Sequence, residues 1–343
     1  AVASFVLLGP HQTSIASRRP VISVGVVRTG VGKSSLTRRL ARFFLEKGRQ
    51  VAAIRHPMPY DDLETQAVQR FGSFEDLDSY KVTIEEREEY EPLIGMGLAV
   101  FAGVDYHAIL HRAEDEADVV IWDGGNNDFS FIKSDLHIVL VDPHRPGHET
   151  SYHPGEANLR MADVVVINKA DSATKEQLAE VQASVAATAR SGVPVVLANS
   201  VFTTEQPELI KGKRVLTVGD GPTLTHGGMP YSAASIASRK FGAAKIVPGK
   251  AFAVGSIEAA YEQYQNMEVE VPALGYSPEQ LADLQATLNA AEVDLVVYAT
   301  PVDLSRLVTI NKPMAAVEYE FKERGPQLRN ILTDFDARLL IGK

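Results

Sequence analysis

Apolar residues along this chain fall into short, nearly continuous runs separated by longer polar stretches. The first such run begins at Val21 and leads into a glycine-rich turn. Later runs with the Val/Ile/Leu content of buried strands cover residues 51–56, 119–123, 136–142, 164–168, 195–198 and 215–218. Runs that are apolar on both faces are typical of parallel strands covered by helices. We therefore expect an α/β fold with a doubly wound, mostly parallel sheet, whose ligands lie beyond the carboxyl ends of the strands.

The pattern continues more loosely after residue 220. It predicts helices at 233–241 and 278–291 and strands at 251–254, 293–299 and 314–319. We expect a nucleotide-binding domain over residues 19–220 and a C-terminal α/β subdomain over 221–343, although periodicity leaves open an extension of the first sheet. Residues 5–10 predict a strand that has no partner before it, and a lone strand is unstable. The segment therefore either pairs with the main sheet or is the tail of something removed, and we interpret residues 1–18 as the tail of a missing N-terminal domain, which the resemblance described below implies.

The turn after the first strand has the chemistry of a phosphate-binding loop. Its sequence, TGVGKSS at residues 29–35, lies between the buried strand and an amphipathic helix. Backbone N–H groups of such a turn bind a triphosphate, Lys33 reaches the outer phosphates, and the Ser34 hydroxyl joins the Mg²⁺ ligands. Val27 occupies the first glycine position of the strict pattern G-x-x-x-x-G-K-[ST]. The predicted nucleotide-binding residues of this loop are Thr29, Gly30, Val31, Gly32, Lys33, Ser34 and Ser35.

Two further strand ends extend the predicted nucleotide site. Asp123 ends an apolar strand and precedes two glycines, which suits a carboxylate near Mg²⁺, with a turn cap as the structural alternative. The run 164–167 is followed by the pattern N-K-x-D, and we expect Asn168, Lys169 and Asp171 to bind the base. The Asp171 carboxylate can accept two hydrogen bonds from guanine that adenine does not offer. Mg²⁺ and either ATP or GTP are the expected cofactor and co-substrate.

Cations and imidazoles follow two other strands, and their residue types suit a phosphorylated substrate. We expect substrate binding by Arg55, His56, His144, Arg145 and His148. Asp62 is a candidate Mg²⁺ ligand, directly or through a bound ligand. A rigid connection at 54–62 and a structural turn or a zinc site at 141–149 are the alternatives. The loop 220–229 suits a lid or an anion-binding turn.

Composition narrows the function classes. The 343 residues are 45% hydrophobic and 23% charged, carry a formal charge of −10 and contain no cysteine. The absence of cysteine excludes a disulfide framework and a cysteine nucleophile, and the negative charge argues against nucleic acid as a partner. The sequence also contains no apolar run long enough to span a membrane. We expect a cytoplasmic protein and leave open whether it forms a homo-oligomer. The acidic run 85–89 is interpreted as a solvated helix face, with a metal cluster as the alternative.

Histidines gather near the predicted strand ends. Those expected at this edge are His56, His144, His148, His153 and His226, whereas we read His11, His107, His111 and His137 as ordinary surface or helix residues. The clustering predicts a site more polar than nucleotide binding alone requires.

Several long segments together resemble a known group of proteins. They include RTGVGKSS, AIRHPMPY, EEREEYEP, FAGVDYHAIL, IWDGGNNDF, HIVLVDPHRPGHE, VVINKAD, DGPTLTHGGM and ATPVDLSRL. These are similar to predicted GTPases or cyclic 2,3-diphosphoglycerate synthetase-like enzymes, of the P-loop class that includes dethiobiotin synthetase and the metallochaperone GTPases. The resemblance covers nearly the whole chain. It implies a further domain before the loop and a ligase that closes two phosphates of 2,3-diphosphoglycerate into an anhydride. Where the similar sequences read PYGD, this chain has Tyr60-Asp61-Asp62.

The predicted reaction is Mg²⁺-dependent phosphoryl transfer from a nucleoside triphosphate to a small phosphorylated substrate, catalysed mainly by positioning and charge neutralisation. The expected catalytic residues are Lys33, Asp123, His56 and Arg145, and the expected metal ligands are Ser34, Asp123 and Asp62. Two alternatives use the same loop: a regulatory or metallochaperone-type GTPase, and a small-molecule kinase. They differ in whether water, an alcohol or a phosphate receives the phosphoryl group.

Overall fold

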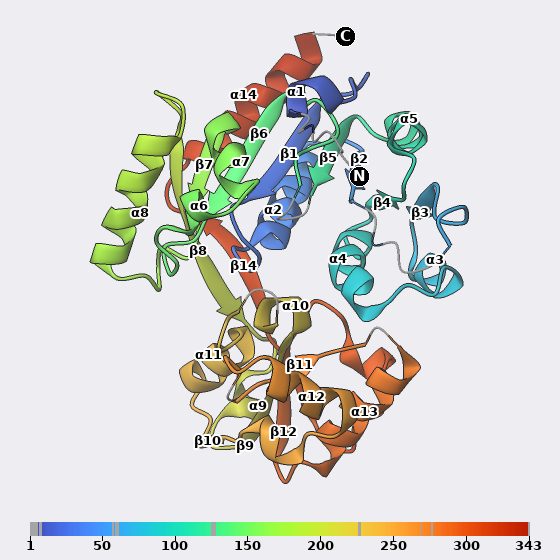
Figure 1. Cartoon of the computed structure of the whole chain (residues 1–343), viewed down its shortest axis with the longest axis vertical. Helices are drawn as coiled ribbons and strands as arrows, with labels where there is room; N and C mark the ends of the chain where they lie inside the picture. The colour runs from blue at the N-terminus through green and yellow to red at the C-terminus, as the bar shows by residue number, and fades with distance from the viewer. Residues whose placement is uncertain are drawn as a thin grey trace, which may run out of the picture. The chain divides into compact units, whose positions relative to one another are not determined.

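The computed structural model describes residues 6, 9–56, 58, 62–124, 128–225, 228–267, 269–275 and 277–341. The chain forms two compact units (Figure 1). The first consists of Ala1–Ser73, Met96–Asn199 and Lys322–Lys343, and the second of Phe74–Gly95 and Ser200–Phe321. These units differ from the ranges 19–220 and 221–343, because an internal segment belongs to the second unit and the C-terminal residues belong to the first. The expected strand at 5–10 lies largely outside the described residues.

The first unit is built on a mostly parallel sheet. Its strand order is β14-β8-β7-β6-β1-β5-β2-β4-β3; the neighbours from β8 to β4 pair in parallel, and β3 is antiparallel to β4. The strands are β1 (Val21–Val26), β2 (Val51–Ile54), β3 (Gln69–Phe71), β4 (Ala99–Ala102), β5 (Val119–Asp123), β6 (Leu136–Val141), β7 (Val164–Ile167), β8 (Val195–Thr203) and β14 (Glu318–Glu323). The chain passes from one unit to the other within β8 and within β14. The chain first adds strands on one side of β1 and then on the other. The carboxyl ends of β1, β5 and β6 therefore meet at the point where the strand order reverses, which is where α/β sheets bind ligands.

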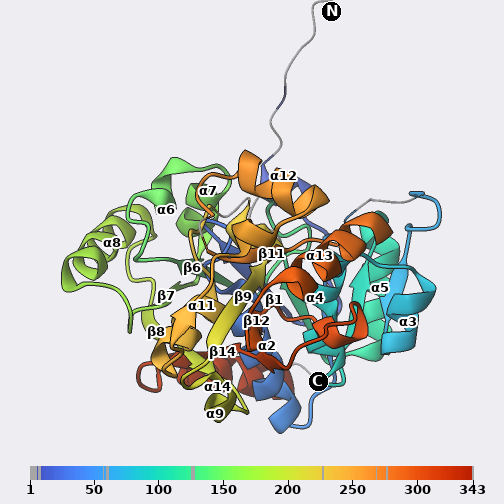
Figure 2. The same ribbon diagram turned by 90° about the horizontal axis from the view of Figure 1, so that it is seen from below.

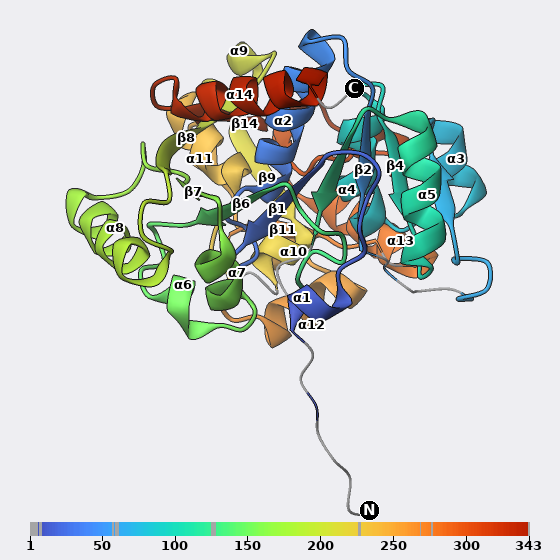
Figure 3. The same ribbon diagram turned by 90° about the horizontal axis from the view of Figure 1, so that it is seen from above.

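Helices cover the sheet of the first unit, as the burial of β1, β2, β5, β6 and β7 along their whole lengths requires. They are α1 (Pro10–Thr13), α2 (Lys33–Glu46), α5 (Tyr106–Glu116), α6 (His148–Ser151), α7 (Gly155–Met161), α8 (Lys175–Thr188) and α14 (Gln327–Ile341). Helix α2 packs on β1 and β5, α5 on β2 and β4, and α7 on β1 and β6. The end of α14 lies beside α2 (Figure 3), where the rings of Phe44 and Phe335 are 6.1 Å apart.

The second unit has a smaller parallel sheet of its own. Its strands are β9 (Arg214–Asp220), β10 (Lys245–Ile246), β11 (Val271–Ala273), β12 (Leu295–Ala299) and β13 (Met314–Ala316). The order is β10-β9-β12-β13, with β11 also pairing with β9. Its helices are α3 (Phe74–Ser79), α4 (Ile84–Ile94), α9 (Pro207–Ile210), α10 (Gly221–Leu224), α11 (Ala233–Lys240), η1 (Gly249–Phe252), α12 (Gly255–Gln263), α13 (Pro278–Ala290) and η2 (Leu304–Arg306).

Successive residues of β9 point to opposite faces and build two cores. Leu216 and Val218 pack with residues of α12 and α13, whereas Val215 packs with residues of α9 and α11. Figure 2 shows β9 and β12 between α11 and α13. The expected α/β class with parallel sheets is thus confirmed. None of the helices in the described part of the chain has the length and apolarity needed to cross a bilayer.

Three local predictions are wrong. Residues 249–252 form the 3₁₀ helix η1 instead of a strand at 251–254. Gly249 packs so close to Val271 that a Cβ there would be 2.4 Å from its Cγ2, and the Val254 N–H donates to the Thr287 hydroxyl at 3.2 Å instead of to a neighbouring strand. The strand expected at 314–319 is two strands, since β13 pairs with β12 and β14 with β8. The acidic run 85–89 lies in α4, but Glu86 and Glu88 are buried.

The buried acids of α4 have specific partners in the second unit. Glu86 completes a capping box with Thr83, and Glu88 accepts a hydrogen bond from the Thr300 hydroxyl at 2.5 Å. Burial, followed by the charge of Asp220, raises the pKa of Glu88 well above its usual value. Within the described residues no group of three or more histidines and acids is arranged to hold a metal ion.

Candidate functional site

The glycine-rich turn connects β1 directly to α2, whose first residue is Lys33. Gly30 and Gly32 have φ angles of 77° and 105°, in the left-handed region that favours glycine. At Gly32 the space is also closed, because a Cβ there would lie 2.2 Å from Nδ2 of Asn168. Backbone conformation and packing thus both require glycine at position 32.

Val27, which occupies the first glycine position of the strict loop pattern, packs closely against a glycine of a neighbouring helix. Val27 is buried, and Gly155 of α7 lies so close that a Cβ there would be 2.7 Å from the Val27 carbonyl oxygen. The backbones of Val27 and of helix α7 therefore lie close together, and this close approach requires glycine on the helix and not in the loop.

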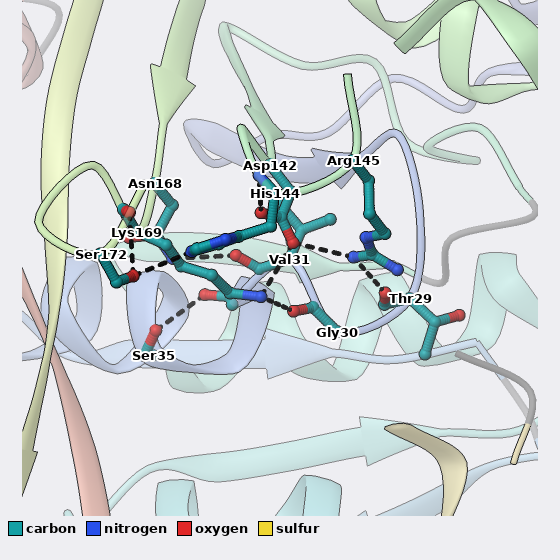
Figure 4. Close-up of polar contacts among 11 residues, drawn as sticks. Thr29, Gly30, Val31, Ser35, Asp142, His144, Arg145, Asn168, Lys169 and Ser172 are labelled. Carbon is teal, nitrogen blue, oxygen red and sulfur yellow. Dashed lines mark hydrogen bonds and ion pairs between the residues drawn. The ribbon is translucent and has the colours of Figure 1, made fainter. Parts of the chain in front are cut away.

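Three side chains from outside the turn and one from within it bind its carbonyl groups (Figure 4). Four consecutive carbonyls each accept a hydrogen bond: Thr29 from Arg145 Nη2 (2.8 Å), Gly30 from Lys169 Nζ (2.6 Å), Val31 from Asn168 Nδ2 (2.8 Å) and Gly32 from Ser35 Oγ (2.8 Å). Because a peptide's C=O and N–H point in opposite directions, fixing the carbonyls fixes the direction of the N–H groups. The loop is thus held in one conformation by residues that follow β6 and β7.

Asp142, at the end of β6, pairs with both cations among these side chains. Its Oδ2 accepts from Lys169 Nζ at 2.8 Å and from Arg145 Nη2 at 3.0 Å, and its Oδ1 accepts from the His144 N–H at 3.0 Å. Burial alone would raise the pKa of the Asp142 carboxyl, but the charges of Lys169 and Arg145 hold it below its ordinary value. Arg145 and Lys169 are therefore paired with a carboxylate beneath the loop.

Asp123 is at the centre of a second buried ion pair. Its Oδ1 accepts from Lys33 Nζ at 2.8 Å and from the Thr37 hydroxyl at 2.9 Å, and its Oδ2 accepts from Arg55 Nη1 at 2.6 Å. Arg55 and Asp123 are each 1% exposed. Burial would raise the pKa of Asp123, but Arg55 and Lys33 hold it well below its ordinary value. The structure thus brings the predicted residues Lys33, Asp123 and Arg55 together.

The histidines of the predicted site have polar neighbours. His56 Nδ1 lies 3.5 Å from Oδ2 of Asp128, and His144 Nε2 is 2.9 Å from the Ser172 hydroxyl. Burial lowers the pKa of His144, and burial together with the charges of Arg145 and Arg28 lowers the pKa of His148. Both imidazoles are thus biased toward the neutral form, so they offer hydrogen bonds more readily than charge.

The remaining predicted positions are more exposed. Asp62 is exposed, and its Oδ1 caps a turn by accepting from the Glu64 N–H at 3.0 Å. Asp171 is exposed, two residues beyond Lys169. Ser34 is half-buried in the first turn of α2. Residues 57, 59–61, 125–127 and 226–227 lie outside the described residues, and with them part of the loops at 54–62 and 220–229.

Sequence patterns missed several residues of this site. Arg28 stacks on the ring of Tyr152, 4.2 Å from its centroid, and Tyr152 also contacts His148. Thr37 could have been predicted, because it lies one helical turn after Lys33 and therefore on the same face of the helix. Arg28 could have been predicted from its position directly before the loop. Asp142 was placed in the strand at 136–142 and was not predicted as a site residue. Outside the site, at the start of β6, His137 had been read as a surface or helix residue; it contacts the Ser23 hydroxyl at 2.5 Å, and burial lowers its pKa to about 4.

Comparison with known proteins assigns the chain to a family. No protein-family model matches it. A curated relative, the arginine synthetase ArcE of Thermococcus kodakarensis, is 52% identical over 336 residues, which cover 98% of this chain and 75% of that protein. The chain belongs to the family of arginine synthetase ArcE. Members of the family therefore include a named synthetase.

A solved structure supports the fold independently. LpxK from Aquifex aeolicus, crystallised with ATP, superposes with a TM-score of 0.55 at 16% identity, over 95% of this chain and 90% of that one. At this identity the likeness concerns the fold alone. The ArcE-family chain thus has the fold of a P-loop NTPase.

Proposed function

We propose that this chain is a nucleoside-triphosphate-dependent synthetase that forms arginine. Two observations support the proposal at different levels. In the phosphate loop, four consecutive carbonyls accept hydrogen bonds from side chains, which orients the loop N–H groups and supports γ-phosphoryl transfer. The 52% identity to arginine synthetase ArcE over 98% of the chain supports arginine as the product.

The chemistry of arginine defines the acceptor. Arginine differs from the ureido amino acid citrulline by a nitrogen in place of the ureido oxygen. In the proposed reaction that oxygen attacks the γ-phosphorus, a new O–P bond forms, and the bond between the γ-phosphorus and the β,γ-bridging oxygen breaks. Ammonia then attacks the ureido carbon, the C–O bond breaks with loss of phosphate, and the nitrogen releases a proton. The balanced reaction converts citrulline, ammonia and the triphosphate into arginine, the diphosphate and phosphate.

The chain's own residues have separate roles in this proposal. The loop N–H groups and Lys33 hold the triphosphate and neutralise the charge that develops on it. Asn168 and Lys169, each fixed to a loop carbonyl, hold the segment that places Asp171 beside the base. His56, paired with Asp128, is the proposed acceptor for the proton that ammonia releases.

Mg²⁺ fits the donors at the loop. A hydroxyl at Ser34 and a carboxylate at Asp123, next to bound phosphates, are the few protein groups that Mg²⁺ usually takes. Because both oxygens of Asp123 already accept hydrogen bonds, Asp123 would hold the ion through a bound water. Asp62, which caps an exposed turn, has no assigned role in the proposal.

The charges around the loop favour an acceptor of low charge. Arg55 and Arg145 were expected to bind a phosphorylated substrate, but they pair with Asp123 and Asp142. His144 and His148 are biased toward neutrality. A neutral ureido group needs less positive charge than 2,3-diphosphoglycerate, which carries several negative charges beside those of the triphosphate.

The test uses the whole chain with Mg²⁺, citrulline and ¹⁵N-ammonium, and either ATP or GTP. Mass spectrometry should detect ¹⁵N-arginine in a one-to-one ratio with released phosphate. Citrulline labelled with ¹⁸O in the ureido group should transfer its label to the phosphate, because the C–O bond breaks. Lys33→Ala should abolish turnover, and the matched control Lys47→Ala, just beyond the other end of α2, should keep it.

Each outcome of this test is informative. Phosphate release that is independent of citrulline would favour a GTPase and contradict the synthetase. Arginine formed without ¹⁸O in the phosphate would contradict the phosphorylated ureido intermediate.

The second candidate is closure of 2,3-diphosphoglycerate into its cyclic anhydride, which the motif resemblance favours. It is tested in parallel by phosphorus NMR, where an upfield anhydride signal that requires 2,3-diphosphoglycerate would support it. Arg28, whose guanidinium stacks on Tyr152, is the cation that this candidate would use.

A further inference from the structure

Asp142 is buried, with an exposed fraction of 3%, at the carboxyl end of β6. Both of its oxygens accept hydrogen bonds, Oδ1 from the His144 N–H and Oδ2 from Arg145 and Lys169. Two of these partners, Arg145 and Lys169, also donate to carbonyls of the loop at residues 29–35. Asp142 is therefore linked to the loop through Arg145 and Lys169.

The same nitrogen atoms serve Asp142 and the loop. Arg145 Nη2 donates to Asp142 and to the Thr29 carbonyl, and Lys169 Nζ donates to Asp142 and to the Gly30 carbonyl. Figure 4 shows the carboxylate with the two cations that reach the loop. Charge-assisted hydrogen bonds are stronger than neutral ones, so this carboxylate favours one position for both cations.

Lys169 also links the loop to the segment expected to bind the base. Its φ of 53° is uncommon for a residue other than glycine, and its Nζ donates both to the Gly30 carbonyl and to Asp142. Asn168 precedes it and binds the Val31 carbonyl. A shift of Lys169 would therefore disturb the phosphate loop and the Asn168–Asp171 segment together.

We propose that Asp142 is a positioning residue for the nucleotide, which holds Arg145 and Lys169 against the phosphate loop and so couples triphosphate binding to base binding. This role rests on the proposed nucleotide-dependent function and deepens it. Asp142 acts on nucleotide affinity and not on the acceptor, because its two cationic partners contact the Thr29 and Gly30 carbonyls.

The test compares three probes by titration calorimetry with Mg²⁺: GTP, ATP and inorganic tripolyphosphate, which has no base. Asp142→Asn keeps an acceptor for the His144 N–H and removes the charge. It should weaken tripolyphosphate about tenfold, and weaken the preferred nucleotide further, up to about a hundredfold. In turnover assays KM for the nucleotide should rise with little change in KM for the acceptor. Asp142→Glu, which restores the charge, should recover part of the affinity.

Asp163→Asn is the matched control. Asp163 also accepts a backbone N–H, that of His137 at 2.8 Å, and pairs with an arginine, Arg190, but it precedes β7 and so lies at the opposite end of these strands. It should leave the affinity for all three probes unchanged. If Asp142→Asn does not fold, Arg145→Met replaces it, since Asp142 then keeps Lys169; the expected loss for tripolyphosphate is again about tenfold.

The outcomes separate this inference from the proposed function. If Asp142→Asn binds all three probes within about twofold of the unchanged chain, the positioning role is refuted while nucleotide binding stands. If the unchanged chain binds neither nucleotide, the proposed function itself fails. If the chain binds nucleotide but forms no arginine, and Asp142→Asn weakens that binding, the proposed acceptor is refuted and the role of Asp142 is supported.

Discussion

Replacing Gly32 with alanine tests the packing of the phosphate loop most directly. The backbone φ of 105° costs an alanine about 1–2 kcal/mol relative to glycine. The new Cβ would also lie 2.2 Å from Asn168 Nδ2, so the amide must move and lose its bond to the Val31 carbonyl. Leaving such buried groups unsatisfied costs about 1–3 kcal/mol. Gly32→Ala should therefore reduce the free energy of unfolding by roughly 2–5 kcal/mol.

Gly48 provides a matched control just beyond the other end of the same helix. Its φ is 74°, and a Cβ there would meet nothing within 4 Å. Gly48→Ala should therefore cost only the backbone contribution, about 1–2 kcal/mol. The difference between the two substitutions measures the collision with Asn168.

Urea denaturation followed by the fluorescence of Trp122, the single tryptophan of the chain and a residue of β5, reports on the first unit. Adding Asn168→Ala to Gly32→Ala removes the collision, so the two changes should together cost less than the sum of their separate effects. Equal losses for Gly32→Ala and Gly48→Ala, with an additive double variant, would refute the close packing of the loop against Asn168.

Other buried charges lead to further predictions. Arg55→Met removes one partner of the buried Asp123 carboxylate and should destabilise the first unit by about 3–5 kcal/mol in the same denaturation assay; a loss below about 1 kcal/mol would contradict it. The folded-state pKa of Asp142 is lowered, so its stabilisation is present above the unfolded-state value near 4 and is lost as the pH falls through the folded value. The folded-state pKa of Glu88 is raised, so its stabilising effect is present at low pH and is lost as the pH rises from about 4 through the folded value. Hydrogen exchange, corrected for the intrinsic rate, should therefore show the second unit protected better at pH 5 than at pH 7, with the first unit losing protection only below about pH 4; a common trend in both units would count against this. Glu88→Gln, which keeps an acceptor for Thr300, should leave stability unchanged or raise it at pH 8, and a loss above 2 kcal/mol would contradict the cost of burying this charge.

The sheet and the position of the loop could be predicted from sequence because they depend on local patterns. Buried parallel strands are continuous apolar runs, and their carboxyl ends share one edge, which brought Lys33, Asp123 and Asn168 together in the prediction. Short runs were less reliable. The residues at 251–254 are apolar enough for a strand, but the close approach of Gly249 to Val271 is a tertiary feature that no window of sequence contains.

The charge state of the site could not be predicted in the same way. A sequence shows which charged residues follow each strand but not which of them face one another. Arg55 and Arg145 therefore read as cations available to a substrate, although Asp123 and Asp142 pair with them across 68 and 3 residues of chain. The Arg55–Asp123 pair is too far apart in the sequence for a local pattern to indicate it. The Arg145–Asp142 pair was not predicted because Asp142 was assigned as the last residue of a strand.

The support of the loop carbonyls by distant side chains has a consequence for folding. Ser35 is 3 residues from its acceptor, whereas Arg145, Asn168 and Lys169 are 116, 137 and 139 residues from theirs. Contacts of such high sequence separation form only after long chain segments have been closed. An isolated segment of β1, the turn and α2 would thus carry Lys33 on a loop whose N–H groups are not yet aligned. Nucleotide should therefore bind only the completed first unit and stabilise it by mass action, by about 2.7 kcal/mol at a hundred times Kd.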